Sequence, residues 1–155
     1  MLTLIAPARR HRRAFWAFVR ECKRAGDHKI QGLYAMPRSY RKFLRDYENE
    51  YFLMEEGKRK ILGLCYFTPG LSAEERRADG DVAYHIAPSE RQKGYGTQLL
   101  ALALAMLRGQ GVRRACATCR KANAPSAKII TANGGVLTEE FEHRGVPRQV
   151  YWIEL

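Results

Sequence analysis

One stretch, residues 86–100, constrains the fold more than any other part of the chain. It reads Ile-Ala-Pro-Ser-Glu-Arg-Gln-Lys-Gly-Tyr-Gly-Thr-Gln-Leu-Leu, so an apolar strand ends and two glycines, Gly94 and Gly96, open an apolar helix. The first turn of a helix has N–H groups without partners and carries the positive end of the helix dipole. Glycine lets the backbone approach phosphate oxygens, and Arg91 and Lys93 add positive charge. The stretch therefore predicts an anion site that suits a pyrophosphate.

Two common nucleotide-binding patterns are absent from this loop. A Walker A loop requires Gly-Lys-Ser/Thr at a spacing that Gly94 does not have, and a dinucleotide fingerprint requires a third glycine where Leu99 stands. Two interpretations are left: a site for another pyrophosphate ligand, or a glycine-rich helix start with solvated basic residues.

Hydrophobic periodicity and the positions of glycine and proline predict the order of elements. Strands are expected at 2–5, 51–55, 61–68, 81–87, 114–119, 135–142 and 148–154, with helices at 8–24, 39–50, 123–133 and around the apolar run 99–107, and loops at 26–37 and 69–80. This order predicts an α/β fold with a mixed, mostly antiparallel sheet, a central parallel strand–helix–strand step over 81–119, and flanking helices. A chain of 155 residues fits a single domain, 1–155.

The motif Arg91-Gln-Lys-Gly-Tyr-Gly96 resembles the acyl-coenzyme A signature of the GNAT superfamily of N-acetyltransferases. Residues 83–91 look like the family's fourth strand and the turn that follows it. The segments Asn123-Ala-Pro-Ser-Ala-Lys-Ile-Ile130 and Asn133-Gly-Gly135 resemble its next helix and the glycine after it. With the ending Tyr151-Trp152-Ile153, the resemblance covers about residues 50–155 and is nearest to bacterial predicted acetyltransferases, which implies a GNAT-like fold.

The resemblance implies acetyl-CoA as co-substrate, no metal, and transfer of the acetyl group to a primary amine by direct attack in a ternary complex. The cofactor would lie where the fourth and fifth strands separate, with the backbone of 86–88 pairing with the pantetheine arm and one N–H polarising the thioester carbonyl. The cofactor-binding residues that the resemblance implies are Ile86, Ala87, Pro88, Arg91, Gln92, Lys93, Gly94, Tyr95, Gly96, Thr97, Asn123, Ser126 and Lys128. Asn123 also suits the N-cap of its helix.

An amine must lose a proton before it attacks, because its unperturbed pKa is about 10.4. The candidates on the predicted strand are Asp81, Tyr84 and His85; the first and last are four residues apart and share one strand face, whereas Tyr84 points the other way. His85 has the most suitable unperturbed pKa. Glutamates 139, 140 and 142 could act instead through water. Many family members place a proton-donating tyrosine where this chain has Ile130. Either Tyr84 or a water takes its place, or the thiolate leaves without a general acid, so we assign no general acid.

The cysteines do not form a metal or redox motif in this interpretation. Cys116 and Cys119 have a C-x-x-C spacing, but on a strand their side chains face opposite sides of the sheet. Unpaired thiols suit a reducing compartment, so a cytoplasmic location is expected. The longest apolar run, 99–107, is far shorter than the roughly 20 residues of a membrane span, so no membrane partner is expected.

Positive charge is concentrated at the N-terminus. Of a net charge of +11, residues 1–45 carry twelve basic and two acidic side chains, and residues 46–155 carry fifteen and fourteen. Such a surface repels polycations, so we expect an amine acceptor that is neutral, acidic or attached to an anionic carrier. The alternatives are an acyl-CoA fold that binds nucleic acid or acts on an aminoacyl-tRNA-type carrier, and a merely solvated helix face. Dimers are common in the family, so a homodimer is a further expectation.

Overall fold

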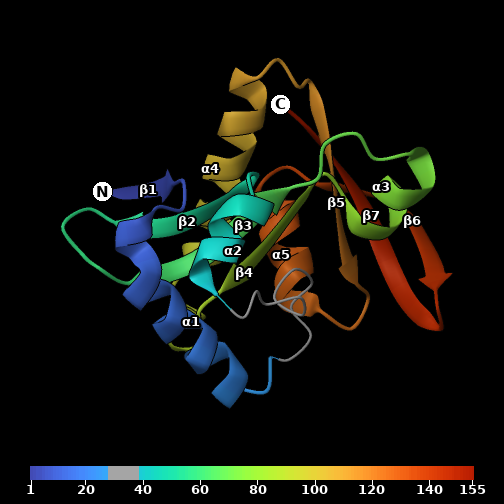
Figure 1. Cartoon of the computed structure of the whole chain (residues 1–155). Helices are drawn as coiled ribbons and strands as arrows, with labels where there is room; N and C mark the ends of the chain where they lie inside the picture. The colour runs from blue at the N-terminus through green and yellow to red at the C-terminus, as the bar shows by residue number, and fades with distance from the viewer. Residues whose placement is uncertain (28–38) are drawn as a thin grey trace.

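The computed structural model describes residues 1–27 and 39–155. Most of the predicted loop 26–37 lies outside this range. The elements in chain order are β1 (Leu2–Ile5), the 3-10 helix η1 (Arg9–His11), α1 (Arg12–Arg24), α2 (Tyr40–Asp46), β2 (Glu50–Glu55), β3 (Ile61–Phe67), α3 (Ala73–Asp79), β4 (Val82–Ile86), the 3-10 helix η2 (Pro88–Glu90), α4 (Tyr95–Gly109), β5 (Arg114–Arg120), α5 (Ala124–Ala132), β6 (Val136–His143) and β7 (Val146–Glu154) (Figure 1).

The strands form two antiparallel sheets, in the orders β1-β2-β3-β4 and β5-β7-β6. This arrangement, with its flanking helices, confirms the predicted mixed α/β fold class. The strand–helix–strand step β4-α4-β5 crosses from one sheet to the other. At the start of the two strands the N–H of Asp81 donates to the carbonyl oxygen of Cys116 at 2.8 Å. Beyond this contact, β4 and β5 do not pair with each other within residues 1–27 and 39–155, so they border a gap between the two sheets.

One face of the first sheet is covered by an aromatic core. The apolar residues of α1 recur at helical spacing, so Phe15, Phe18 and Cys22 point inward together. The ring of Phe15 lies 4.4 Å from that of Phe43 in α2, and Phe43 stacks on Phe52 of β2 at 6.0 Å. The first two helices are thereby fixed on the face of the sheet that carries His85 at its edge.

An aliphatic core around α4 joins the two sheets. The buried side of α4 includes Leu99, Leu100 and Leu107, which belong to one cluster with Val82 of β4 and Ile153 of β7. The helix is apolar all round, as predicted, but the alanines at 101 and 105 are exposed. Across residues 1–27 and 39–155, no helix combines the length and apolar character of a membrane span.

Helix α3 replaces part of the predicted loop 69–80. The hydroxyl of Ser72 accepts from the N–H of Glu75 at 3.2 Å, and the carboxylate of Glu75 accepts from the N–H of Ser72 at 2.9 Å. This reciprocal capping box is readable as Ser-x-x-Glu in the sequence, and the prediction overlooked it because the segment is polar throughout.

Two further boundaries were predicted wrongly. Helix α2 ends at Asp46 rather than near residue 50, because Glu50 pairs with Tyr66 at the start of β2. Strand β7 begins at Val146 rather than at 148. Arg144 and Gly145 have φ values of 51° and 76°, which is the backbone of a two-residue hairpin turn, so Pro147 falls inside the strand.

Candidate active site

A pocket of about 560 Å³ lies between β4, the start of α4 and α5. Nine predicted cofactor-binding residues line it: Ile86, Arg91, Gln92, Gly94, Gly96, Thr97, Asn123, Ser126 and Lys128. The other four, Ala87, Pro88, Lys93 and Tyr95, do not line this pocket. The predicted loop and the predicted helix 123–133 therefore do meet around one cavity.

The glycines of the loop serve two different purposes. Gly94 precedes α4 with a φ of 80°, and a Cβ there would come no closer than 3.8 Å to another residue. At Gly96, by contrast, a Cβ would lie 2.5 Å from Cδ1 of Ile129 in α5. The sequence analysis explained both glycines by the approach of phosphate. The structure gives Gly96 a further role, because only glycine allows α4 and α5 to pack this closely.

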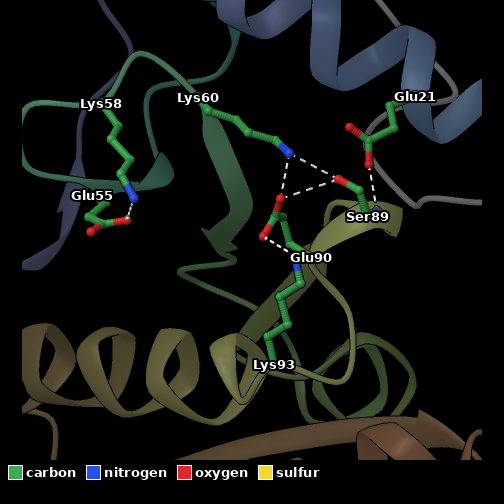
Figure 2. A network of polar contacts seen from close by, with 7 residues as sticks. All are labelled: Glu21, Glu55, Lys58, Lys60, Ser89, Glu90 and Lys93. Atoms are coloured by element: carbon green, nitrogen blue, oxygen red, sulfur yellow. Dashed lines mark hydrogen bonds and ion pairs between the residues drawn. The ribbon is translucent and has the colours of Figure 1, made fainter.

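Lys93 belongs to an ion-pair network beside the loop rather than to the pocket wall (Figure 2). Glu90 is only 8% exposed, and its carboxylate pairs with Lys93 at 3.0 Å and with Lys60. These two cations lower the pKa of Glu90 to about 2. The N–H of Ser89 donates to the carboxylate of Glu21 at 2.7 Å, which ties the same turn to α1. The network fixes the loop before the helix starts.

The backbone of β4 offers hydrogen-bonding groups to the pocket at Ile86. The N–H of Ala87 donates to the carbonyl oxygen of Leu62 at 2.9 Å and is therefore occupied, and Pro88 has no N–H. Because paired and unpaired positions alternate along an antiparallel ladder, the backbone groups of Tyr84 and Ile86 face away from β3. Of the three residues predicted to present backbone groups, Ile86 is the one that can offer an N–H to this edge.

Helix α5 brings Asn123 and Ser126 to the pocket. The side-chain oxygen of Asn123 accepts from the N–H of Ser126 at 3.2 Å, which confirms its predicted role as N-cap. The hydroxyl groups of Tyr84 and Ser126 lie 2.9 Å apart. Burial raises the pKa of Tyr84 to about 12, so this phenol is protonated at neutral pH.

His85 lies on the face of β4 opposite to that of Tyr84, as predicted for consecutive strand residues. Its ring contacts Phe18 edge-on at 6.0 Å, and its Nε2 lies 3.3 Å from the carboxylate of Asp27 and 3.2 Å from the guanidinium of Arg91. Arg91 also forms an ion pair with Asp27. Burial and, less strongly, the charge of Arg91 lower the pKa of His85 to about 4 against the opposing effect of Asp27. The imidazole is therefore neutral at pH 7.

A second pocket, of about 430 Å³, adjoins the first on the side of β5 and β7. The two pockets share Asp27, Tyr84, His85, Asn123 and Ser126. The remaining wall of the second pocket includes Tyr66 of β3, Thr118 and Arg120 of β5, and Arg148 of β7. Tyr84 and His85 thus stand at the junction of two cavities, each large enough for part of a small ligand.

Asp81 is not brought to this junction. One carboxylate oxygen accepts from Nε of Arg76 at 2.8 Å and the other from the N–H of Cys116 at 2.8 Å. Asp81 lines a different cavity, of about 500 Å³, which Tyr84 and His85 do not line. The glutamates are also placed elsewhere: Glu139 pairs with Arg77 and Glu140 pairs with Lys121 at 2.7 Å, and neither 139, 140 nor 142 lines either pocket at the junction.

The cysteines have the geometry that the sequence predicts. Cys116 approaches the carbonyl oxygen of Arg76 in α3 at 3.6 Å, whereas Cys119 interacts with Ser126 of α5, so the two thiols face opposite sides of β5. Within the described residues, Cys22, Asp27 and His85 bring three ligand-type atoms within 4.8 Å of one another. Burial raises the pKa of Cys22 to about 12, and Arg91 already contacts the other two side chains, so this cluster suits proton transfer better than cation binding.

Sequence reasoning missed Asp27, Arg120 and Arg148 as site residues. Asp27 follows the end of α1 in a stretch expected to be loop, and the two arginines belong to strands whose pairing is fixed only in the fold. No local pattern identifies any of the three. Ile129 could have been found, because it lies between Asn123 and Asn133 in the segment that carries the helix motif.

Comparisons with known proteins agree with this geometry. The sequence profile of the acetyltransferase (GNAT) domain matches residues 2–136. Among solved structures, a ribosomal L7/L12 α-N-protein acetyltransferase in complex with coenzyme A is similar, with a TM-score of 0.76, 19% identity, and coverage of 99% of this chain and 94% of that one. A microcin C7 self-immunity acetyltransferase in complex with acetyl-CoA and AMP is similar with a TM-score of 0.75 and 17% identity, and the match covers 99% of this chain and 92% of that one. A putative acetyltransferase from Salmonella typhimurium with acetyl-CoA is similar with a TM-score of 0.66 and 17% identity, and the match covers 99% of this chain and 94% of that one. The search of curated proteins finds no match.

Proposed function

The chain belongs to the GNAT family and is an acyltransferase, and on this basis we propose that it transfers the acetyl group of acetyl-CoA to a primary amine by direct attack in a ternary complex. The observation that carries the proposal is the junction at Tyr84 and His85, where a pocket behind the glycine loop meets a second pocket. We assign the cofactor to the first pocket, called here the cofactor pocket, and the amine to the second, called the acceptor pocket.

The residues of the cofactor pocket fit acetyl-CoA. The N–H groups of residues 92–97 lie around the start of α4, which suits a pyrophosphate. The edge of β4 at Ile86 suits the amide groups of the pantetheine arm, since one strand edge there has no ladder partner within residues 1–27 and 39–155. In this assignment the Ile86 N–H polarises the thioester carbonyl and stabilises the oxyanion as the amine attacks. Asn123 and Lys128 add polar contacts from α5.

His85 is the residue that we assign to remove the proton from the amine. It is neutral at pH 7 and reaches the acceptor pocket, and Asp27 beside it stabilises the imidazolium that forms. A base with a pKa of about 4 is weak. Arg91 contributes to this low value, so movement of its guanidinium toward the cofactor phosphates would raise the basicity of His85. Asp27 then acts as a positioning residue.

Tyr84 is the group that we assign to the departing sulfur. Its hydroxyl keeps its proton at neutral pH and faces the cofactor pocket beside Ser126. Ile130, at the position where many family members have a proton-donating tyrosine, is fully buried in the aliphatic core and cannot take this part. Tyr84 would donate a hydrogen bond to the thiolate as it leaves.

The test is release of free thiol from acetyl-CoA in the presence of a panel of amines. Intersecting initial-velocity lines are expected for a ternary complex, and parallel lines would contradict direct attack. Replacing Tyr84 with Phe should lower kcat by roughly 10²-fold, the lower end of the range for a positioned proton donor, with an unchanged Kd for acetyl-CoA. The matched control is Tyr95→Phe, since Tyr95 does not line either pocket. Equal kcat values for both variants would remove Tyr84 from the mechanism.

A cavity lined by Arg9, Arg12, Arg41 and Trp16 favours a second candidate, an acceptor on an anionic carrier such as aminoacyl-tRNA. These arginines are exposed and Trp16 is half-buried, a combination suited to phosphate and base contacts. Charged tRNA therefore belongs in the acceptor panel, at several salt concentrations. An affinity that falls steeply with salt would support this candidate.

A further inference from the structure

Two arginines stand directly opposite each other in the acceptor pocket. In the register of β5 and β7, Arg120 pairs with Arg148, and both side chains line the pocket that holds Tyr84 and His85. Like charges at directly opposed positions destabilise a sheet. The pair therefore has a cost in stability that its own strands do not offset.

Among residues 1–27 and 39–155, no carboxylate lies within 4 Å of a charged nitrogen of either arginine. Neither arginine forms an ion pair with residues 1–27 or 39–155, although this range contains nine such pairs. One terminal nitrogen of Arg148 donates to the hydroxyl of Thr118 at 3.2 Å. Its Nε is buried and has no hydrogen-bond partner among the described residues. A buried N–H of a cation without an acceptor is costly unless a ligand supplies one.

Resting on the acetyl transfer proposed above, we propose that Arg120 and Arg148 form an anion-binding subsite, and that the acceptor is a compact amine that itself carries a carboxylate or a phosphate group. Guanidinium groups bind both anions through paired N–H donors. The pocket volume of about 430 Å³ is near the low end of the range for small-molecule sites, so the anionic group and the amine belong to one small molecule. The amine lies toward His85 and Asp27, and the anionic group lies toward β7.

The test compares acceptors that differ only in the anion. Thiol release is measured for amino acids against their methyl esters and for phosphoethanolamine against ethanolamine. The amine of an ester is less basic, which favours the ester, so a preference for the free acid cannot arise from easier deprotonation. We expect kcat/KM to be at least about tenfold higher for the anionic member of one of the two series, as a charge-assisted contact provides. The series that shows the preference identifies carboxylate or phosphate as the recognised group.

Variants assign the preference to the two arginines. Arg148→Gln and Arg120→Gln should each reduce the preference to less than about threefold while leaving the KM for acetyl-CoA unchanged. The matched control is Arg113→Gln, which removes the same charge beside the start of β5 and does not line either pocket. Thermal unfolding checks each fold, and Arg120→Gln should be at least as stable as the wild type because it removes like-charge repulsion.

The outcomes separate this proposal from the proposed function. If the wild type releases no thiol with any amine, the proposed function fails, and the subsite is tested by calorimetry of N-acetylglycine and inorganic phosphate on the protein saturated with coenzyme A. Weaker binding to Arg148→Gln than to Arg113→Gln in that measurement would support the subsite. If amines are acetylated with no preference for an anionic group, if all variants bind equally, or if only charged tRNA is accepted, the subsite for a compact acceptor is overturned.

Discussion

Among the described residues, the arginine of the cofactor pocket is ion-paired, whereas the two arginines of the acceptor pocket are not. In the first, Arg91 is paired with Asp27, and Lys93, just outside its wall, is paired with Glu90. In the second, Arg120 and Arg148 form no ion pair with residues 1–27 or 39–155. A paired cation must give up its carboxylate before it can bind an anion, whereas an unpaired one is already available. We therefore expect the cofactor phosphates to bind chiefly to the backbone N–H groups at the start of α4 and to Lys128, and the acceptor to bind to the side chains of Arg120 and Arg148.

The largest expected effect comes from placing a negative charge at the helix start. Gly94→Asp should weaken acetyl-CoA binding by about 100-fold, since two unit charges about 6 Å apart repel by about 3 kcal/mol at an effective dielectric constant of 20. The control is Gly94→Asn, which has the same shape and tolerates the left-handed backbone at this position without the charge. Calorimetry measures both. Equal losses for Asp and Asn would mean that backbone geometry, and not an anion site, governs binding here.

The comparison of Gly94→Asp with Gly94→Asn tests the anion site more directly than any change at Gly96 does, because a Cβ at Gly96 would also push against Ile129. A loss of cofactor binding in a Gly96 variant would mix altered helix packing with altered charge.

A smaller effect concerns pH and tests the charge balance where the two pockets meet. The pKa of His85 is about 4 in the folded chain and about 6.5 when unfolded, so the unfolded chain binds the additional proton between these values. Stability from burying the neutral ring is complete above pH 6.5 and is lost as the pH falls toward 4. Between pH 7 and pH 5, the wild type should lose about 2 kcal/mol more unfolding free energy than His85→Gln. Denaturant unfolding at both pH values measures this, and parallel losses in the two proteins would contradict it.

The smallest expected effect tests whether the ion pair of Arg91 with Asp27 weakens cofactor binding. Asp27→Asn frees Arg91, so acetyl-CoA affinity should rise by about fivefold, which corresponds to the roughly 1 kcal/mol of a partly exposed ion pair. The same change removes the carboxylate beside His85, so kcat should fall. Calorimetry and thiol release give the two quantities. An unchanged or weaker cofactor affinity would show that pairing with Asp27 does not compete with phosphate binding.

The sequence predicted those parts of the candidate site that depend on motifs of a few neighbouring residues. The loop 91–97 and the helix cap at Asn123 are local patterns, and the structure places both around one pocket. The capping box of Ser72 and Glu75 is equally local and was readable, so missing α3 was an error of interpretation.

Other features depend on contacts between distant parts of the chain. Asp27 contacts Arg91 across 64 residues, and Arg120 lies opposite Arg148 only once β5 and β7 pair. Neither contact follows from spacing along a strand or helix. Asp81 illustrates the reverse case: its spacing from His85 predicted a shared strand face, but it precedes β4, and Arg76 and the N–H of Cys116 hold its carboxylate away from the junction.

The same residue connects the two sheets. Asp81 joins β4 to β5 through its own N–H and through its side chain, and the strands diverge from that point. A small change in the angle between β4 and β5 at Asp81 would produce a larger change in the distance between the far ends of these strands. The width of the gap there therefore responds most to changes made near Asp81. The size of acceptor admitted by the enzyme could therefore be adjusted by substitutions around Arg76 and Cys116, outside both pockets, without altering a residue that touches either substrate.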